Sequence, residues 1–109
     1  MNIGADIEEV ERFKKYLKDK GRLCRLFSKD EITYCLSKKK PQQHLAARFC
    51  AKEAVWKTLE DKKISVFDIS VKNNAQGAPE IYIKNKKQKN IKISLSHTKT
   101  YAVAFAVKL

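Results

Sequence analysis

Near its amino terminus the sequence places an acidic residue where a predicted strand gives way to a helix. Asp6 stands in the run Gly4-Ala5-Asp6-Ile7, and Arg12 follows on the helix. A carboxylate held at a rigid element end is a hard oxygen donor of the kind that magnesium prefers. The same carboxylate could act as a plain helix cap, because it can accept hydrogen bonds from a helix N-terminus. Asp6 is therefore a candidate metal ligand, and the capping interpretation stays open.

A second acidic residue, Glu53, lies within the helical stretch Ala47–Lys57. At about 100° per residue, Glu53 falls on the same helix face as Phe49 and Trp56. A carboxylate on an apolar face is costly unless it is paired or binds a metal. Glu53 could also form an (i, i+4) ion pair with Lys57, as many helix residues do. Both interpretations of Glu53, metal ligand and ion-pair partner, stay open.

A third polar group spans Ser94–Lys99 and includes Ser96 and His97. Hydroxyls, an imidazole and a lysine at the end of a strand can bind a phosphate. A polar β-turn without a ligand explains the same residues. Ser96 and His97 do not make a convincing nucleophile and base, because adjacent strand residues point to opposite faces. The sequence has no Gly-rich phosphate loop and no Cys/His zinc spacing.

Helices are predicted between the Asp6 segment and the helical stretch that carries Glu53. The strand is expected over Asn2–Ile7, followed by a helix from Glu8 to about Lys18 and a break at Gly21. A capping-box pattern at Ser28–Glu31 opens a second short helix. After Pro41 a longer helix is expected over residues 42–59.

The second half of the chain changes to the period of strands. The segments are the β-branched run Ile64–Val71, a turn at Asn74–Gly77, and strands at Glu80–Lys84, Ile91–Ser96 and around Val103. In the last strand Ala102, Ala104 and Ala106 share one face, which predicts close approach by another element or subunit. One strand, then helices, then several strands predicts an α+β fold, with an antiparallel β-sheet and helices packed on one side. Residues 1–109 are expected to form a single domain.

Charge is the strongest signal in the composition. The sequence has 24 Lys and Arg against 12 Asp and Glu, a formal net charge of +12. Such a surface attracts nucleic acid, anionic membranes, acidic proteins or phosphate-rich ligands. No apolar run approaches the roughly 20 residues that span a bilayer, and the N-terminus becomes charged too soon for a signal peptide. The three cysteines lack metal spacing and are expected to be reduced packing residues, so we expect a cytoplasmic protein.

Taken together, the motifs resemble the holo-[acyl-carrier-protein] synthase family of phosphopantetheinyl transferases, in its short, trimeric branch. The matching segments are Gly4-Ala5-Asp6-Ile7 with Arg12, Arg48–Lys57, Asn74–Pro79 and Ser94–Thr98. They cover nearly the whole chain in the family's order. The sequence departs from the family at Lys57-Thr58-Leu59-Glu60, where Lys-Ala-(Leu/Phe)-Gly is usual.

The resemblance implies a reaction and a role for each matching residue. The 4′-phosphopantetheine arm of coenzyme A would pass to a serine of an apo acyl carrier protein, releasing adenosine 3′,5′-bisphosphate. Asp6 and Glu53 would hold Mg²⁺, and Lys57 would complete the catalytic set. The residues implied to contact coenzyme A are Arg48, Lys52, Lys57, Ser96 and His97. Those implied to meet the acidic carrier protein are Arg12, Arg22 and Arg25. The family's sites form between subunits of a homotrimer.

Two other functions fit parts of the sequence. A non-catalytic nucleic-acid-binding domain would explain the charge and the lysine-rich loops beside Tyr82 and Tyr101. It would not explain Glu53 on an apolar helix face, and no RNA-recognition or helix-turn-helix signature is present. An inert scaffold that binds carrier proteins is the other alternative. We therefore expect neither nucleic acid nor a membrane as partner, and magnesium-dependent binding of coenzyme A would separate the enzyme from both alternatives.

Overall fold

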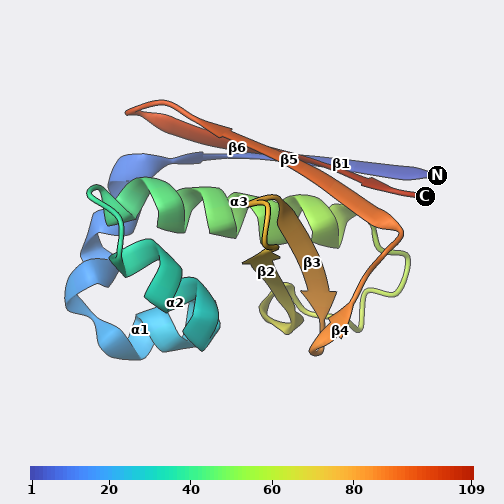
Figure 1. The fold of residues 1–109 in the computed structure, drawn as a ribbon, viewed down its shortest axis with the longest axis horizontal. Helices are drawn as coiled ribbons and strands as arrows, with labels where there is room; N and C mark the ends of the chain where they lie inside the picture. Colours follow the sequence, from blue (N-terminus) through green and yellow to red (C-terminus); the bar gives the residue numbers. More distant parts are fainter.

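The structure, a computed structural model, describes all residues 1–109 (Figure 1). In chain order its elements are β1 (Asn2–Glu9), the 3-10 helix η1 (Val10–Lys18), α1 (Lys20–Leu26), α2 (Lys29–Leu36), α3 (Pro41–Thr58), the 3-10 turn η2 (Val66–Asp68), β2 (Ile69–Asn73), β3 (Pro79–Ile83), β4 (Lys86–Lys87), β5 (Ile91–His97) and β6 (Tyr101–Lys108). One strand, then helices, then strands follow one another as the sequence pattern predicts. The α+β prediction is confirmed.

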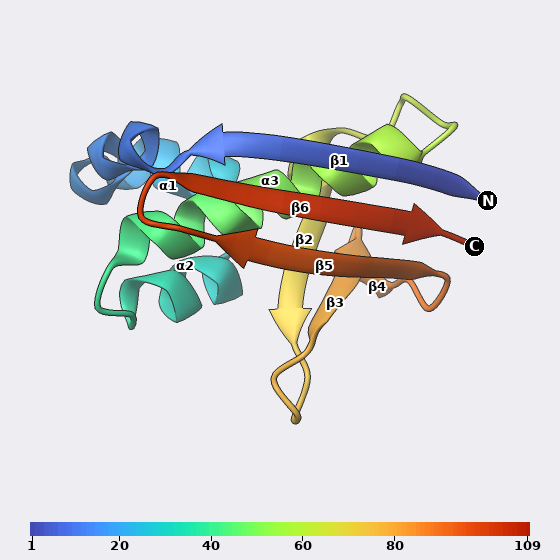
Figure 2. The same ribbon diagram turned by 90° about the horizontal axis from the view of Figure 1, so that it is seen from above.

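The larger sheet is antiparallel and has the order β1–β6–β5, with β6 in the middle (Figure 2). α3 runs along one face of this sheet (Figure 1). Ala102, Ala104 and Ala106 of β6 are buried on that face. Methyl side chains let a helix lie close to a sheet. The predicted alanine face therefore receives α3 of the same chain, so it is not free to meet a second subunit.

The opposite face of this sheet, here called the outer face, carries no helix (Figure 1). Its apolar side chains Ile3, Ile7, Val103 and Phe105 are 40% to 64% exposed. Strand residues alternate between the two faces of a sheet, so the side that α3 does not cover is left bare. The prediction that helices pack on one side is confirmed.

The smaller sheet has the antiparallel order β2–β3–β4 and lies below α3 in Figure 1. Its first strand begins later than the β-branched run predicts, at Ile69. Ser65 caps η2 instead, because its Oγ accepts a hydrogen bond from Phe67 N at 3.1 Å. The predicted turn before β3 is confirmed, since Asn74 Oδ1 accepts hydrogen bonds from two backbone N–H groups and Gly77 has a φ of 85°.

The amino-terminal third differs from the prediction in two places. β1 continues to Glu9, which pairs with Tyr101, and η1 replaces the α-helix expected from Glu8. Sheet pairing along β6 outweighs the local helical period here. Gly21 does not break the chain but lies inside α1, whose capping residue Asp19 accepts a hydrogen bond from Arg22 N at 3.1 Å.

α2 begins with the predicted capping box. Ser28 Oγ accepts a hydrogen bond from Glu31 N at 3.2 Å, and Glu31 Oε1 accepts one from Ser28 N at 2.8 Å. The other oxygen, Glu31 Oε2, accepts a hydrogen bond from Val71 N of β2 at 2.8 Å. A cap that sequence reasoning treats as local thus also ties α2 to the smaller sheet.

α3 is the centre of the core. It starts with Pro41 in its first turn, where the missing N–H would have had no helical partner, and its bounds match the predicted 42–59 within a residue. Leu45, Cys50 and Val55 are among its fully buried side chains. None of the helices is long and apolar enough to cross a membrane.

The three cysteines are free, as predicted, but only two of them pack in the core. Cys35 and Cys50 are buried, whereas Cys24 is exposed on α1. The expectation that each is a packing residue is therefore wrong for Cys24. Its helix is short, and only Leu23 of α1 is buried.

Candidate active site

The candidate site is made possible by a glycine where β1 meets α3. A methyl group added at Gly4 would lie 2.1 Å from the carbonyl oxygen of Ala54. Carbon and oxygen that are not bonded approach to about 3.3 Å. Only glycine therefore allows the backbone of β1 to lie this close to α3, and this approach brings Asp6 beside the last turns of the helix.

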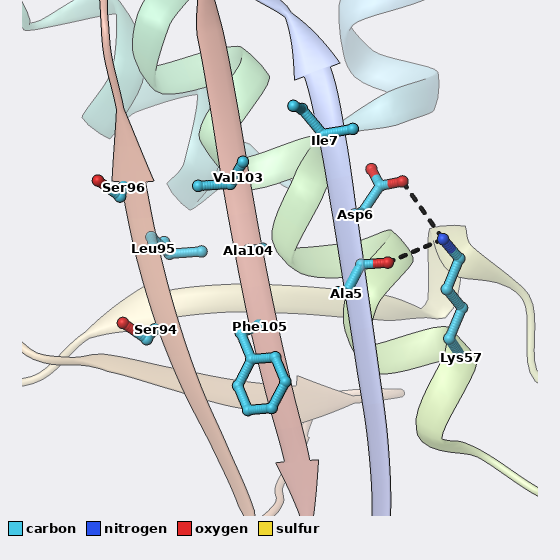
Figure 3. A pocket seen from close by; sticks show the side chains of 10 residues that line it. All are labelled: Ala5, Asp6, Ile7, Lys57, Ser94, Leu95, Ser96, Val103, Ala104 and Phe105. Carbon is cyan, nitrogen blue, oxygen red and sulfur yellow. Dashed lines mark hydrogen bonds and ion pairs between the residues drawn. The ribbon is translucent and has the colours of Figure 1, made fainter.

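Lys57 bridges the two elements. Its Nζ donates a hydrogen bond to the carbonyl oxygen of Ala5 at 2.8 Å and lies 3.5 Å from Asp6 Oδ1 (Figure 3). The Lys57 side chain is 47% exposed, whereas that of Asp6 is only 14% exposed. A solvent-accessible ammonium is thus fixed next to a mostly buried carboxylate.

Asp6 has one carboxylate oxygen without a partner. Oδ2 is buried and has no hydrogen bond, and such a group is costly unless something satisfies it. Burial raises the pKa of Glu53, and the neighbouring charge of Asp6 raises it further, while Lys57 lowers it. Two neighbouring acids and an unsatisfied carboxylate oxygen are oxygen donors of the kind that a divalent cation binds.

A cation held there would need further oxygen ligands. No three histidine, cysteine or acidic side chains lie close enough together to hold a metal by themselves. Asp6 and Glu53 would therefore leave coordination positions open to water or phosphate oxygens. Such an incomplete protein shell is usual for magnesium, which keeps waters and binds substrate phosphates.

Glu8 is a functional candidate that the sequence prediction missed. Burial raises the pKa of Glu8 to about 7, helped by the hydrogen bond that a protonated Glu8 would donate to the Asp6 side chain and by the charge of Asp6, although Arg12 opposes this. Arg12 Nη1 lies 3.5 Å from Glu8 Oε1. The sequence could have indicated Glu8, because a strand that continues past Ile7 places Glu8 on the same face as Asp6.

A polar cavity of about 350 Å³ lies between α2, α3 and β5, and we call it the cationic cavity. Its main polar side chains are Tyr34, His44, Arg48, Asn73, Ser94 and His97. Arg48 is buried, donates a hydrogen bond from Nη2 to Asn73 Oδ1 at 3.1 Å, and lies 4.3 Å from the centre of the Tyr34 ring. A guanidinium held in place on one side can bind an anion with the other.

Three of the residues predicted to contact coenzyme A do not line the cationic cavity. Lys57 lies beside Asp6 at the acidic site. Lys52 is 1% exposed, and its Nζ lies 2.6 Å from Glu31 Oε1 and donates a hydrogen bond to Leu26 O. Ser96 lines a hollow on the outer face instead. The structure therefore brings Arg48 and His97 together, but it places Lys52 in an ion pair inside the core.

The hollow on the outer face has a volume of about 490 Å³ and reaches the acidic site at its edge (Figure 3). Asp6 and Lys57 lie at one side of it, Val103 and Phe105 in the middle, and Ser96 at the other side. Most of its lining residues are apolar. An apolar hollow that ends at a charged pair can bind both an apolar group and a polar one.

The acidic site and the cationic cavity lie at opposite edges of the larger sheet. Asp6 belongs to the edge strand β1, and His97 ends the other edge strand, β5 (Figure 2). Two strand spacings of about 4.8 Å separate these edges. On α3, Glu53 faces Asp6, whereas Arg48 faces Tyr34 and Asn73. The polar groups are therefore distributed over two flanks of one chain.

The three predicted carrier-protein arginines lie on neighbouring elements at one end of the molecule (Figure 1). Arg12 is on η1, and Arg22 and Arg25 are on α1. All three are exposed, and Arg22 pairs with Asp19 at 3.3 Å. This end of the molecule offers a basic surface close to the acidic site, because Arg12 contacts Glu8.

Comparison with known proteins identifies the family. The sequence model of the 4′-phosphopantetheinyl transferase superfamily matches residues 2–106. The chain belongs to this superfamily. A holo-[acyl-carrier-protein] synthase of Thermodesulfovibrio yellowstonii is 46% identical over 108 residues, which cover 96% of this chain and 95% of the relative. That of Protochlamydia amoebophila is 42% identical over 117 residues, 98% of this chain and 96% of the relative.

Solved structures of the family share the fold. The holo-(acyl-carrier-protein) synthase of Bacillus anthracis in complex with CoA (3′,5′-ADP) is 31% identical, with a TM-score of 0.80 over 98% of this chain and 94% of that one. The Helicobacter pylori synthase in complex with coenzyme A is 28% identical, with a TM-score of 0.81 over 98% and 99% of the two chains. The family inferred from the sequence motifs is confirmed, and the chain is an enzyme of the phosphopantetheinyl transferase class.

Proposed function

We propose that the chain transfers 4′-phosphopantetheine from coenzyme A to a serine of an apo acyl carrier protein, with Mg²⁺, and releases adenosine 3′,5′-bisphosphate. The observation that carries this proposal is the buried, unpartnered oxygen Asp6 Oδ2 beside Glu53 and Lys57. The named relatives cover nearly the whole chain and support the same reaction. Two relatives of known structure hold coenzyme A or its nucleotide.

Asp6 and Glu53 would be the protein ligands of Mg²⁺. When bound, the ion would neutralise charge on the diphosphate of coenzyme A. Phosphoryl transfer needs positioning and charge neutralisation more than covalent help from the protein. Lys57 would supply a fixed positive charge to the pyrophosphate, since its ammonium is anchored on Ala5 O and remains accessible.

The nucleotide end of coenzyme A would bind in the cationic cavity, where Arg48 and His97 face a common space. Ser96 would contact the ligand from the outer face, where it lines the other hollow. Lys52 would act indirectly, because its ion pair with Glu31 joins α3 to α2 one helical turn after Arg48.

Such a ligand would bridge two copies of the chain, and we propose a homotrimer. The acidic site and the cationic cavity lie at opposite sheet edges within one chain, and the outer face leaves Ile3, Ile7, Val103 and Phe105 exposed. Packing outer faces together would bury this apolar surface. It would also bring the β1 edge of one copy next to the β5 edge of another.

Mixing two inactive variants tests the shared site. Glu53→Gln removes the acidic half and His97→Glu the cationic half. If each site uses two copies, mixed oligomers contain some intact sites, and partial activity should return after the variants are unfolded and refolded together. Activity that stays absent in the mixture, with both variants folded, would mean that one chain supplies the whole site.

The carrier protein would dock on Arg12, Arg22 and Arg25. These arginines are exposed at one end of the molecule, and the net charge of +12 would steer an acidic partner toward the enzyme. Association should therefore weaken as salt increases. We also propose that residues 1–109 act as one domain around a single core, and that the protein works in the cytoplasm, where its free thiols would stay reduced.

Mass spectrometry of the carrier protein tests the reaction itself. Apo carrier protein, coenzyme A, Mg²⁺ and the enzyme are mixed, and the carrier protein should gain the mass of one phosphopantetheine arm. Asp6→Asn and Glu53→Gln should abolish this gain while the fold persists. Asp61→Asn, at an exposed acid in the loop after α3, is the matched control and should behave like wild type. Near-normal transfer by either ligand variant would refute the assigned metal site.

A further inference from the structure

A second histidine stands next to His97 in the cationic cavity. His44, in the first turns of α3, contacts the His97 ring at the end of β5, with ring centres 5.5 Å apart and planes at 67°. Both imidazoles line the same cavity. His44 is half-buried and fixed from the other side by the Tyr34 ring, whose centre lies 5.9 Å away.

Every titratable or charged group that faces His44 is neutral or cationic. Tyr34 comes from α2, Lys38 from the turn after α2, Arg48 from the next turn of α3, and His97 from β5. Lys38 Nζ also lies 4.6 Å from the centre of the Tyr34 ring. No carboxylate lines the cavity. An anion there would therefore meet several donors and no carboxylate that competes for them.

The surroundings of His44 disfavour a positive charge on its imidazole. Burial lowers its pKa, and the charges of His97, Lys38 and Arg48 lower it further. A bound phosphate monoester carries up to two negative charges. Its charge would reverse this repulsion and favour the protonated imidazole, which has two N–H donors where the neutral one has one.

We propose that His44 is a second phosphate-binding imidazole, which acts with His97 to recognise the 3′-phosphate of coenzyme A and takes up a proton when that phosphate binds. The inference rests on the proposed function, because it assumes that coenzyme A is the ligand. It assigns to His44 a specificity for the phosphorylated ribose that Arg48 alone would not supply. The cavity is within the size range of small-molecule sites.

Isothermal titration calorimetry of coenzyme A and of 3′-dephospho-coenzyme A tests the assignment. The proteins are wild type, His44→Phe, His44→Gln and the control Lys39→Ala, an exposed lysine outside the cavity. Titrations are run in buffers of different ionisation enthalpy, between about pH 6 and about pH 8, where imidazoles titrate. His44→Phe keeps a ring against Tyr34 and His97, so that packing is preserved while the donors are lost.

For wild type we expect proton uptake with coenzyme A but not with the dephospho form. His44→Phe should weaken coenzyme A binding about tenfold at the lower pH, the value of one hydrogen bond to a charged group. It should leave the dephospho form unchanged. His44→Gln should keep part of the affinity but lose the proton uptake, and Lys39→Ala should match wild type.

Two results for His44→Phe would overturn the assignment. If His44→Phe bound coenzyme A with wild-type affinity and proton uptake, or weakened both ligands equally, His44 would have no phosphate role. If wild type bound neither ligand, the proposed function would be wrong and this inference with it.

Discussion

Replacing Gly4 with alanine should separate β1 from α3 and disable the acidic site. The added methyl group would lie 2.1 Å from Ala54 O and 3.1 Å from Lys57 Cβ. Since carbon and oxygen need about 3.3 Å, the strand must move away from the helix by roughly 1 Å. The obstacle is a helix carbonyl, which has no rotamer to change, so the backbone itself has to shift.

The shift should affect stability and catalysis together. Overpacking a tight contact costs about 1–3 kcal/mol, and we expect the upper part of that range because the clash is with backbone. Moving β1 by this amount would lengthen the 2.8 Å hydrogen bond from Lys57 to Ala5 O and displace Asp6 from Glu53. A misplacement of about 1 Å in an active site can lower the rate about a hundredfold.

Urea unfolding and the carrier-protein transfer assay measure the two effects. Gly21→Ala is the matched control, because its added methyl group would lie 3.5 Å from Asp19 Oδ1, an ordinary contact within α1. That variant should be slightly more stable, by about 0.5–1 kcal/mol, since alanine favours helix, and fully active. If Gly4→Ala had wild-type stability and transfer rate, close approach of β1 to α3 would not be what forms the site.

Three further predictions follow from other contacts. Lys52→Met leaves Glu31 buried without its partner and should lower the free energy of unfolding by about 3–5 kcal/mol in urea; a loss below about 1 kcal/mol, the value of an exposed pair, would contradict this. The pKa of Glu8 is raised from 4.5 to about 7 in the folded state. Protonated Glu8 therefore contributes stability that is fully present below about pH 4.5 and is lost as pH rises through about 7. Without Mg²⁺, Glu8→Gln should therefore match wild type near pH 4.5 and be about 1–3 kcal/mol more stable at about pH 8, whereas an equal difference at both pH values would exclude this linkage. Arg12→Glu should raise the KM for carrier protein but leave the Kd of coenzyme A unchanged, and equal losses for both ligands would argue against separate roles.

Local sequence signals predicted those parts of the fold that depend on neighbouring residues. The capping box at Ser28, the proline start of α3 and the Asn74 turn all form as expected. The alternation in β6 correctly predicted a buried alanine face. The ordered motifs identified the family, because each keeps functional residue types at fixed spacing.

Other features depend on contacts between distant segments. β1 extends to Glu9 because β6 pairs with it along its whole length, and no local pattern encodes that pairing. Lys52 matches a family motif, yet its partner Glu31 comes from another helix. The contact between His44 and His97 joins residues from α3 and β5. Helical spacing alone could not predict these partners.

Manganese binding measured by electron paramagnetic resonance tests the central claim, that Asp6 and Glu53 share one divalent cation. With coenzyme A present, wild type should bind a single Mn²⁺ per site, displaced by Mg²⁺. Asp6→Asn and Glu53→Gln should each abolish this binding, although both variants remain folded. If either variant kept wild-type affinity for Mn²⁺, the two carboxylates would not hold a common ion, and the proposed site would be contradicted.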